Sequence, residues 1–177
     1  MKKQQITMKK LISAVLLLFA MNASSQEINK KFKDDAGNVL GLINTCTREG
    51  LNAIPEMKSR YEVEYPNYQP DSATLKALKP LLKGKKITIV MGTWCGDSHL
   101  QVPHFYKILD ALKVSEKETT LICVDRSKKA ENGLIDQLNI LHVPTFIFTE
   151  KGKEIGRIIE SPRETLEKDM LSILAKK

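Results

Sequence analysis

Cys95 stands where an apolar, β-rich run ends and a helix is expected to begin. The run covers residues 87–91, and apolar spacing predicts the helix over roughly 97–113, with Pro103 kinking it. The unpaired backbone N–H groups of a first helical turn and the helix dipole favour a thiolate. Cys95 is therefore predicted to be a nucleophile that forms mixed disulfides. The alternative is an unreactive cysteine on a fold that serves binding.

Ser98 follows Cys95 by three residues, one helical turn further on. A serine hydroxyl can donate a hydrogen bond to a thiolate, but it cannot close a disulfide with it. A mixed disulfide on Cys95 would therefore last until an outside thiol resolves it. That behaviour suits isomerisation, deglutathionylation-like exchange or substrate trapping. It does not suit repeated two-electron reduction unless a second protein supplies the resolving thiol.

The other residues of the loop, Trp94, Gly96 and Asp97, are assigned to substrate binding. Trp94 would shield the loop and form its substrate-facing rim, or simply pack against the following helix. Asp97 stabilises a helix start, but its negative charge disfavours a thiolate at Cys95. A plain role at the start of the helix is therefore at least as good an interpretation of Asp97 as a catalytic one.

Two further cysteines bring the total to three, so at least one thiol stays unpaired. Cys123 lies within an apolar strand-like run, where cysteine behaves as a small buried hydrophobe. Cys46 lies in a segment with little local pattern, and it could pair with a partner, with Cys123 or with nothing.

The three histidines, His99, His104 and His142, raise the question of a copper or zinc site with Cys95. No Cys-x-x-Cys or His-x-x-x-His pair is present, and single ligands at loose spacing are weak evidence. No metal site and no cofactor are predicted, and a metal-handling protein remains the weakest of the alternatives.

Residues 1–25 have the pattern of a cleaved export signal. Four lysines precede or adjoin an apolar run at 11–20, which is too short to span a bilayer, and Ala23-Ser24-Ser25 supplies small residues for cleavage. The mature chain is expected to begin near Gln26, whether translation starts at Met1 or Met8. The predicted location is periplasmic or extracellular, with no membrane span after cleavage.

The mature chain has the length and composition of one globular domain. Without residues 1–25 it keeps 24 basic residues against 21 acidic ones, a net charge of +3. That charge is too small to indicate a nucleic-acid partner, which calls for Lys and Arg clustered on one face.

The order of predicted elements indicates the fold class. Residues 39–43 are a short strand or a helix turn, 51–61 a helix, 65–70 extended chain, and a helix begins at Asp71 or Ser72 and ends at Gly84. Beyond the strand at 87–91 and its helix, the pattern predicts a strand at 119–124, a helix at 131–139, strands at 145–149 and 154–159, and a helix starting at 161–164. This order predicts an α/β sheet with parallel strands and a terminal antiparallel hairpin.

The loop and a later proline carry a resemblance to a known family. At Trp94-Cys95-Gly96-Asp97-Ser98 and Val143-Pro144-Thr145 the chain resembles the thioredoxin superfamily, and most of all exported members with this Trp-Cys-Gly-Asp-Ser loop. The resemblance covers residues 72–177. It implies a thioredoxin-like fold, with a central mixed sheet flanked by helices, preceded by an extension at 26–71.

The resemblance also implies roles for two residues and marks two departures. Pro144 aligns with the family's cis-proline, which would place the Val143 backbone beside Cys95, ready to hold a substrate peptide as an added strand. Ser98 stands where the family has its second cysteine, and Ile89 where it has a buried acid.

The sequence therefore predicts an exported thiol–disulfide exchange protein that acts through one cysteine, with Cys95 and Ser98 as its catalytic pair. Its partners would be protein or small-molecule thiols and disulfides, together with an external redox partner. The alternative is a non-enzymatic module that binds extended peptides beside Pro144.

Overall fold

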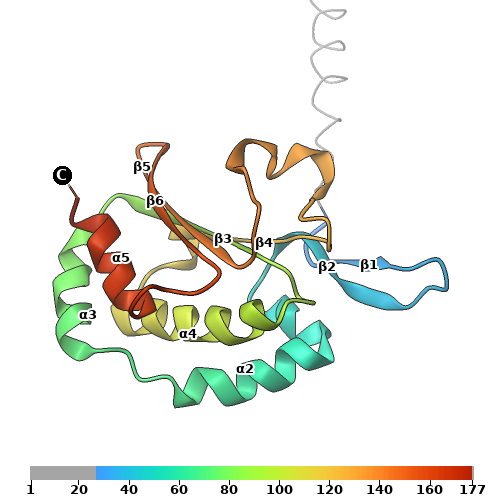
Figure 1. The fold of residues 1–177 in the computed structure, drawn as a ribbon, viewed down its shortest axis with the longest axis horizontal. Coiled ribbons are helices and arrows are strands. Elements are labelled where there is room, and N and C mark those ends of the chain that lie inside the picture. The colour runs from blue at the N-terminus through green and yellow to red at the C-terminus, as the bar shows by residue number, and fades with distance from the viewer. Residues whose placement is uncertain (1–26, 177) are drawn as a thin grey trace, which may run out of the picture.

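A six-stranded sheet forms the centre of the protein, in the strand order β1-β2-β4-β3-β5-β6 (Figure 1). The computed structural model describes residues 27–176, so the predicted signal at 1–25 lies outside the described residues. The strands are β1 (Lys30–Lys33), β2 (Val39–Cys46), β3 (Lys85–Met91), β4 (Thr119–Cys123), β5 (Thr145–Glu150) and β6 (Lys153–Ile159). The helices are α2 (Pro55–Asn67), α3 (Ser72–Leu78), α4 (Gly96–Leu112) and α5 (Leu166–Leu174).

The directions of the strands follow the predicted pattern. β3 and β4 are parallel and are joined by α4, while β5 and β6 form an antiparallel hairpin that pairs with β3. A parallel connection needs a crossover, and α4 supplies it. The α/β class and the mixed, thioredoxin-like sheet flanked by helices are thereby confirmed.

The sheet separates two apolar clusters. The larger cluster lies between the sheet and the helices and contains Ile89, Met91 and Phe105. The smaller one lies on the other face and contains Val90 and Val143. Alternate residues of β3 enter opposite clusters, as the two-residue period of a strand requires. Figure 1 shows α2, α3, α4 and α5 on one side of the sheet and the segment between β4 and β5 on the other.

The segment predicted as an N-terminal extension continues the same sheet and core. β2 pairs antiparallel with β4, and β1 pairs antiparallel with β2 to form a hairpin that projects from the sheet (Figure 1). α2 packs against α4. Within residues 27–176 no helix is long and apolar enough to cross a bilayer.

Three local predictions were wrong. Residues 131–139 form two short 3₁₀ turns instead of a helix, because Asn132 and Asn139 take left-handed backbone angles that a helix cannot contain. The last helix begins at Leu166, after the cap Thr165 and not at residues 161–164. α2 continues to Asn67, so residues 65–67 are helical and not extended.

Candidate active site around Cys95

Cys95 is the N-cap residue of α4 and lies four residues after β3 ends. Its backbone is extended, with φ −96° and ψ 126°, and its N–H donates to the carbonyl of Gly92 at 3.0 Å. Its own carbonyl accepts the first helical bond, from the N–H of His99 at 3.0 Å. The residue is half-buried and stands at the positive end of a 17-residue helix.

Val143 lies directly beside Cys95. The Cys95 thiol donates to the carbonyl oxygen of Val143 at 3.2 Å. The peptide bond between Val143 and Pro144 is cis. Pro144 immediately precedes β5, whose first residue pairs with Val90 at the end of β3. The antiparallel pairing of β3 and β5 therefore brings together residues that lie 48 positions apart in the sequence.

Ser98 is fully buried in the first turn of α4. Its hydroxyl oxygen accepts a hydrogen bond from the N–H of Gly92 at 3.3 Å. The Cys95 sulfur bonds to Val143 instead, so the serine supports the backbone of the loop and does not contact the thiol through a hydrogen bond. Ile89, at the position of the family's buried acid, is fully buried in the helix-side cluster.

Trp94 ties the loop to the neighbouring strand. Its indole Nε1 donates to the carbonyl of Val124 at 2.9 Å, and the ring packs with Cys95 against the smaller apolar cluster. The guanidinium of Arg126 lies over the ring, 5.2 Å from its centroid. Gly96 and Asp97 are both exposed. Sequence reasoning missed Arg126, because its contact with Trp94 depends on which strand lies beside β3.

Thr93 connects the loop to the N-terminal hairpin. Its hydroxyl oxygen accepts a hydrogen bond from the buried N–H of Leu42 in β2 at 3.0 Å. A Cβ atom on Gly41 would lie only 2.6 Å from that oxygen, so the approach of the two segments requires glycine at residue 41. No local sequence signal could have identified this contact, because its partners lie 51 residues apart.

The three histidines have separate partners and do not converge on Cys95. His99 bonds through Nε2 to the Thr93 carbonyl at 2.8 Å, His104 lies 3.2 Å from a carboxylate oxygen of Glu64, and His142 lies 3.2 Å from one of Glu160. In the part of the chain that the structure describes, no three His, Cys, Asp or Glu side chains are grouped to hold a metal ion.

The two other thiols are buried on the helix side of the sheet. Cys46 donates to the carbonyl of Asn44 at 3.6 Å. Burial, together with the neighbouring Cys46 thiol, raises the pKa of the Cys123 thiol well above its ordinary value. Cys46 and Cys123 are both buried, whereas Cys95 is only half-buried.

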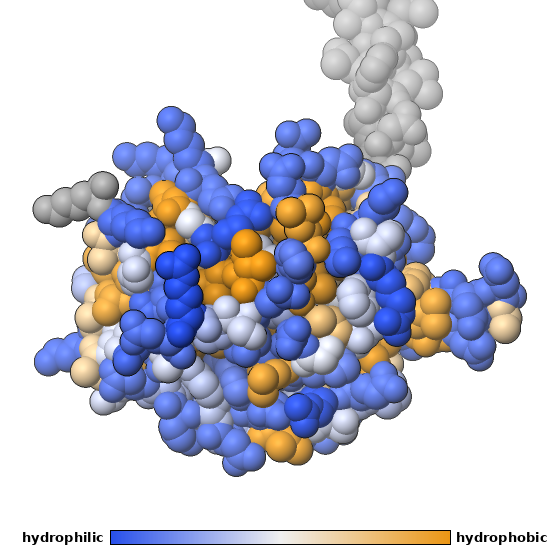
Figure 2. All heavy atoms as spheres, viewed as in Figure 1, coloured by the Kyte–Doolittle hydropathy of each residue, from blue (hydrophilic) through white to orange (hydrophobic). Residues whose placement is uncertain are grey.

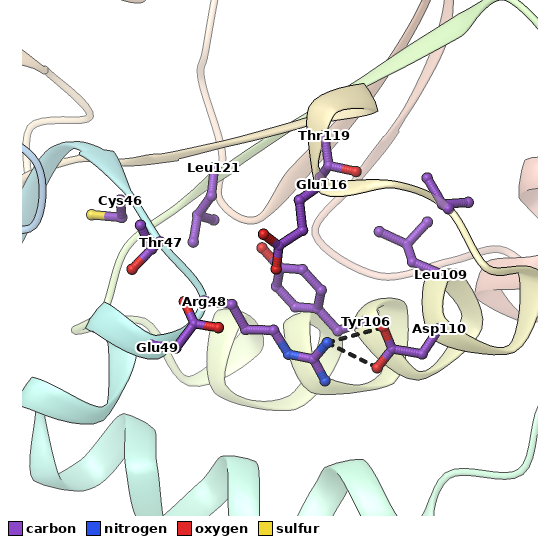
Figure 3. A pocket seen from close by; sticks show the side chains of 11 residues that line it. Cys46, Thr47, Arg48, Glu49, Tyr106, Leu109, Asp110, Glu116, Thr119 and Leu121 are labelled. Atoms are coloured by element: carbon purple, nitrogen blue, oxygen red, sulfur yellow. Dashed lines mark hydrogen bonds and ion pairs between the residues drawn. The ribbon is translucent and has the colours of Figure 1, made fainter.

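A cavity of about 210 Å³ lies away from Cys95 (Figure 3). Its lining includes Asp110 near the C-terminal end of α4 and Thr119 at the start of β4, which is the opposite edge of the sheet. Figure 3 shows Arg48 pointing toward Asp110, with which it pairs at 2.8 Å. The Arg48 guanidinium also lies 4.8 Å from the centroid of the Tyr106 ring. These contacts join the segment before α2 to α4 and do not involve the Cys95 loop.

Comparison with known proteins gives distant similarity to thioredoxins. Thioredoxin H9 of Arabidopsis thaliana is 27% identical over 82 residues, which cover 46% of this chain and 54% of that protein. Thioredoxin H2 of the same plant is 28% identical over 83 residues, covering 47% and 58%. The chain spans about half the length of the curated relatives it matches. No protein-family model matches it.

The solved structures that match this chain also have low sequence identity to it. A protein of unknown function from Pseudomonas aeruginosa is 16% identical with a TM-score of 0.48, covering 68% of this chain and 82% of that one. Mitochondrial thioredoxin 3 from Saccharomyces cerevisiae, in its oxidised form, is 25% identical with a TM-score of 0.37, covering 55% and 89%. The chain therefore has a thioredoxin-like fold, and over about half of its length it is distantly similar to thioredoxins.

Proposed function

We propose that this protein is an exported thiol–disulfide exchange protein that acts through a single nucleophilic cysteine, Cys95. One observation carries the proposal. Cys95 is the half-exposed N-cap residue of α4 beside the carbonyl of Val143, and the residue one turn further along the helix is the buried Ser98.

The reactivity of Cys95 would come from its place at the start of α4. The N–H groups of a first helical turn have no partners within the helix, and the helix dipole favours negative charge there by about 0.3–1 kcal/mol at an exposed site. Asp97, exposed in the same turn, opposes this effect. Among the three cysteines only Cys95 combines access to solvent with a helix N-terminus.

The proposed reaction is one exchange step. The Cys95 thiolate attacks a sulfur of the substrate disulfide, a new S–S bond forms, and the old S–S bond breaks. The leaving sulfur departs as a thiolate and takes a proton from water. The Cys95 sulfur is thereby oxidised to the disulfide level and the leaving sulfur is reduced to a thiol.

Release of the product would need a thiol from outside the protein. Ser98 offers only a hydroxyl, and Cys46 and Cys123 lie in the helix-side cluster, whereas Cys95 packs against the cluster on the other face. Ile89 provides no carboxylate to accept a proton where the family places one. An external thiol would attack the mixed disulfide, form a disulfide with the bound group and return Cys95 to its reduced form.

Substrate binding is proposed for the residues around the thiol. Trp94 and Gly96 flank Cys95 in the loop, and Val143 and Pro144 lie on the other side of the sulfur. Asp97 completes the exposed rim of the first helical turn. The Cys95 thiol and the Val143 carbonyl are in contact, so an extended peptide would lie along the exposed rim of these two segments, with its disulfide next to Cys95.

Export is proposed from residues 1–25, on their lysines, short apolar run and small residues alone. N-terminal sequencing of the protein recovered from outside the cytoplasm is expected to begin near Gln26. Recovery of the intact chain from the cytoplasm alone would contradict the proposal.

The exchange function is tested by incubating the full protein with oxidised glutathione and measuring intact mass. Wild type is expected to gain one glutathione adduct that peptide mapping places on Cys95, and Cys95→Ser is expected to lose it. Absence of any adduct on Cys95 would contradict the exchange function and would favour a non-enzymatic peptide-binding module.

A further inference from the structure

The loops that follow β3 and β4 lie at the same edge of the sheet. The two strands are parallel, with Met91 opposite Cys123, and the N–H of Val124 donates to the Met91 carbonyl at 2.9 Å. Parallel strands end at a common edge, so the chain after each strand meets the other there. The hydrogen bond from Trp94 to Val124 joins the two loops directly.

Arg126 places a cation on the ring of Trp94, the neighbour in sequence of the proposed nucleophile. Its guanidinium stacks on Trp94, the residue immediately before Cys95. Stacking on an indole ring is favourable for a guanidinium and leaves its N–H groups free at the edges. Arg126 is exposed, and within residues 27–176 no carboxylate pairs with it, in contrast to Arg48 and Arg157.

The turn that carries Arg126 has a fixed shape. The Asp125 carboxylate accepts hydrogen bonds from the Ser127 hydroxyl at 2.8 Å and from the Lys129 N–H at 2.9 Å. The N–H of Lys128 donates to the Asp125 carbonyl at 3.0 Å. Asp125 therefore bonds within its own turn, while Arg126 projects from that turn onto the Trp94 ring.

A second cavity, of about 160 Å³, adjoins the same turn. Its lining includes Lys128, Lys129 and Asp136, together with Ile135 and Ile140 of the smaller apolar cluster, against which Cys95 also packs. The apolar cluster that Cys95 packs against thus continues to a cavity lined by two lysines and one aspartate. The exposed Asp97, on α4, is the opposing charge on the helix side.

We propose that the Cys95 site prefers disulfides that carry a carboxylate close to the sulfur, and that Arg126 is the residue that determines this preference. The proposal rests on the exchange function of Cys95. A guanidinium binds a carboxylate through two parallel N–H···O bonds, which would fix the substrate with its disulfide over Cys95. The cationic and acidic side chains around the site are balanced in number, so the preference comes from this one contact and not from a broad positive field.

The bond changes are those of the exchange step. Cys95 attacks the sulfur of the bound half of the disulfide, the S–S bond breaks, and the other half leaves as a thiolate that is protonated by water. The carboxylate stays paired with Arg126 throughout, so the contact lowers the free energy of both the bound substrate and the transition state.

Three disulfides of similar size but different charge test the proposal. They are 3,3′-dithiodipropionate, which carries two negative charges, bis(2-hydroxyethyl) disulfide, which is neutral, and cystamine, which carries two positive charges. The measurement is the second-order rate of adduct formation on Cys95 by intact mass, for wild type and variants. Comparing each variant with wild type on the same probe cancels the different leaving groups of the probes.

Arg126→Ala is expected to lower the rate with dithiodipropionate by about two- to fivefold, the range for an exposed ion pair, and to leave the neutral probe unchanged. Arg126→Glu is expected to lower it further and to raise the rate with cystamine. Both effects should shrink at high salt. Lys83→Ala is the matched control, because Lys83 is an exposed cation just before β3, at the opposite edge of the sheet.

Equal changes with all three probes would overturn the proposal, because they would mean that Arg126 supports the loop and does not select charge. An unchanged rate with dithiodipropionate in both variants would also overturn it. In either case the rate of wild type with the neutral probe still shows whether Cys95 exchanges. Failure of the exchange function itself would appear as no adduct on Cys95 with any of the three probes.

Discussion

The hydroxyl oxygen of Ser98 accepts a hydrogen bond from the N–H of Gly92, at 3.3 Å, inside the loop that carries Cys95. The side chain is fully buried there, in the first turn of α4 and one turn after Cys95. A cysteine in its place would put a second sulfur into the same turn without altering the exposed surface.

Ser98→Cys is expected to create a dithiol that closes a disulfide with Cys95. Reduction of insulin disulfides with dithiothreitol as the recycling agent should rise by about tenfold or more, equivalent to about 1.4 kcal/mol in the barrier. Ile89 limits the gain, because no carboxylate is present there to accept a proton. The control is Ser72→Cys, at the start of α3, which should leave the rate unchanged. Equal rates for wild type and Ser98→Cys would contradict the proposal that reduction is slow because residue 98 carries no thiol.

Thr93→Val is expected to destabilise the protein. Valine has almost the same shape as threonine but cannot accept the hydrogen bond from the buried Leu42 N–H. Leaving that donor unpaired costs about 1–3 kcal/mol in the free energy of unfolding, measured by urea denaturation. Thr88→Val, in β3, is the control, because no side-chain hydrogen bond of Thr88 is found within residues 27–176. If Thr93→Val lowers the free energy of unfolding no more than the control does, the hydrogen bond between Thr93 and Leu42 does not stabilise the protein.

Glu167 links acid pH to stability. Burial raises its pKa, but the hydrogen bonds from the Asp71 N–H at 3.0 Å and the Tyr68 hydroxyl at 2.6 Å outweigh burial, and the net pKa is lowered from 4.5. As the pH falls below 4.5, Glu167 takes up a proton in the unfolded chain before it does so in the folded protein. The stabilisation is therefore fully present above about pH 4.5 and is lost as the pH falls through the lower pKa of the folded protein.

Glu167→Gln should thus lower the free energy of unfolding by about 1–2 kcal/mol at pH 7, because the amide keeps one acceptor and turns an N–H toward the other donor. The difference from wild type should shrink below pH 4. Urea unfolding across pH 3–8 measures it, with the exposed Glu164→Gln as the control. A difference that is constant over the whole pH range would contradict the assignment to Glu167.

The sequence predicted the elements whose pattern is local and strong. The run at 87–91, the helix after Cys95 and the hairpin near residue 152 all have the expected apolar spacing, and the structure has β3, α4 and the β5–β6 pair there. The segment at 131–139 has apolar residues at helical spacing too, but two asparagines with left-handed backbone angles interrupt it. Periodicity alone does not contain that information.

In the candidate site, too, the sequence predicted the features with a local pattern and not those that depend on the whole fold. Cys95 and its place at the start of a helix follow from the sequence, and the resemblance placed Val143 beside it. The contacts of Thr93 with β2 and of Arg126 with Trp94 depend on which strands are neighbours in the sheet. Strand order is set by packing of the whole chain, so short-range patterns could not supply these two contacts.

The three thiols are expected to react with an alkylating reagent at different rates. Limited alkylation with iodoacetamide followed by peptide mapping should label Cys95 first, because it is half-exposed while Cys46 and Cys123 are buried. The raised pKa of Cys123 makes that thiol the slowest to react. Labelling of either buried thiol ahead of Cys95 would contradict the choice of nucleophile.

The lifetime of the mixed disulfide on Cys95 tests the single-cysteine mechanism most directly. The wild-type protein is loaded with glutathione on Cys95, freed of excess reagent and followed by intact mass with and without added thiol. The Cys46→Ser, Cys123→Ser double variant, which keeps no thiol besides Cys95, is the control. The account predicts that the adduct persists alone and is released at a rate proportional to the thiol concentration. Release without any added thiol, at a rate independent of protein concentration, would contradict it.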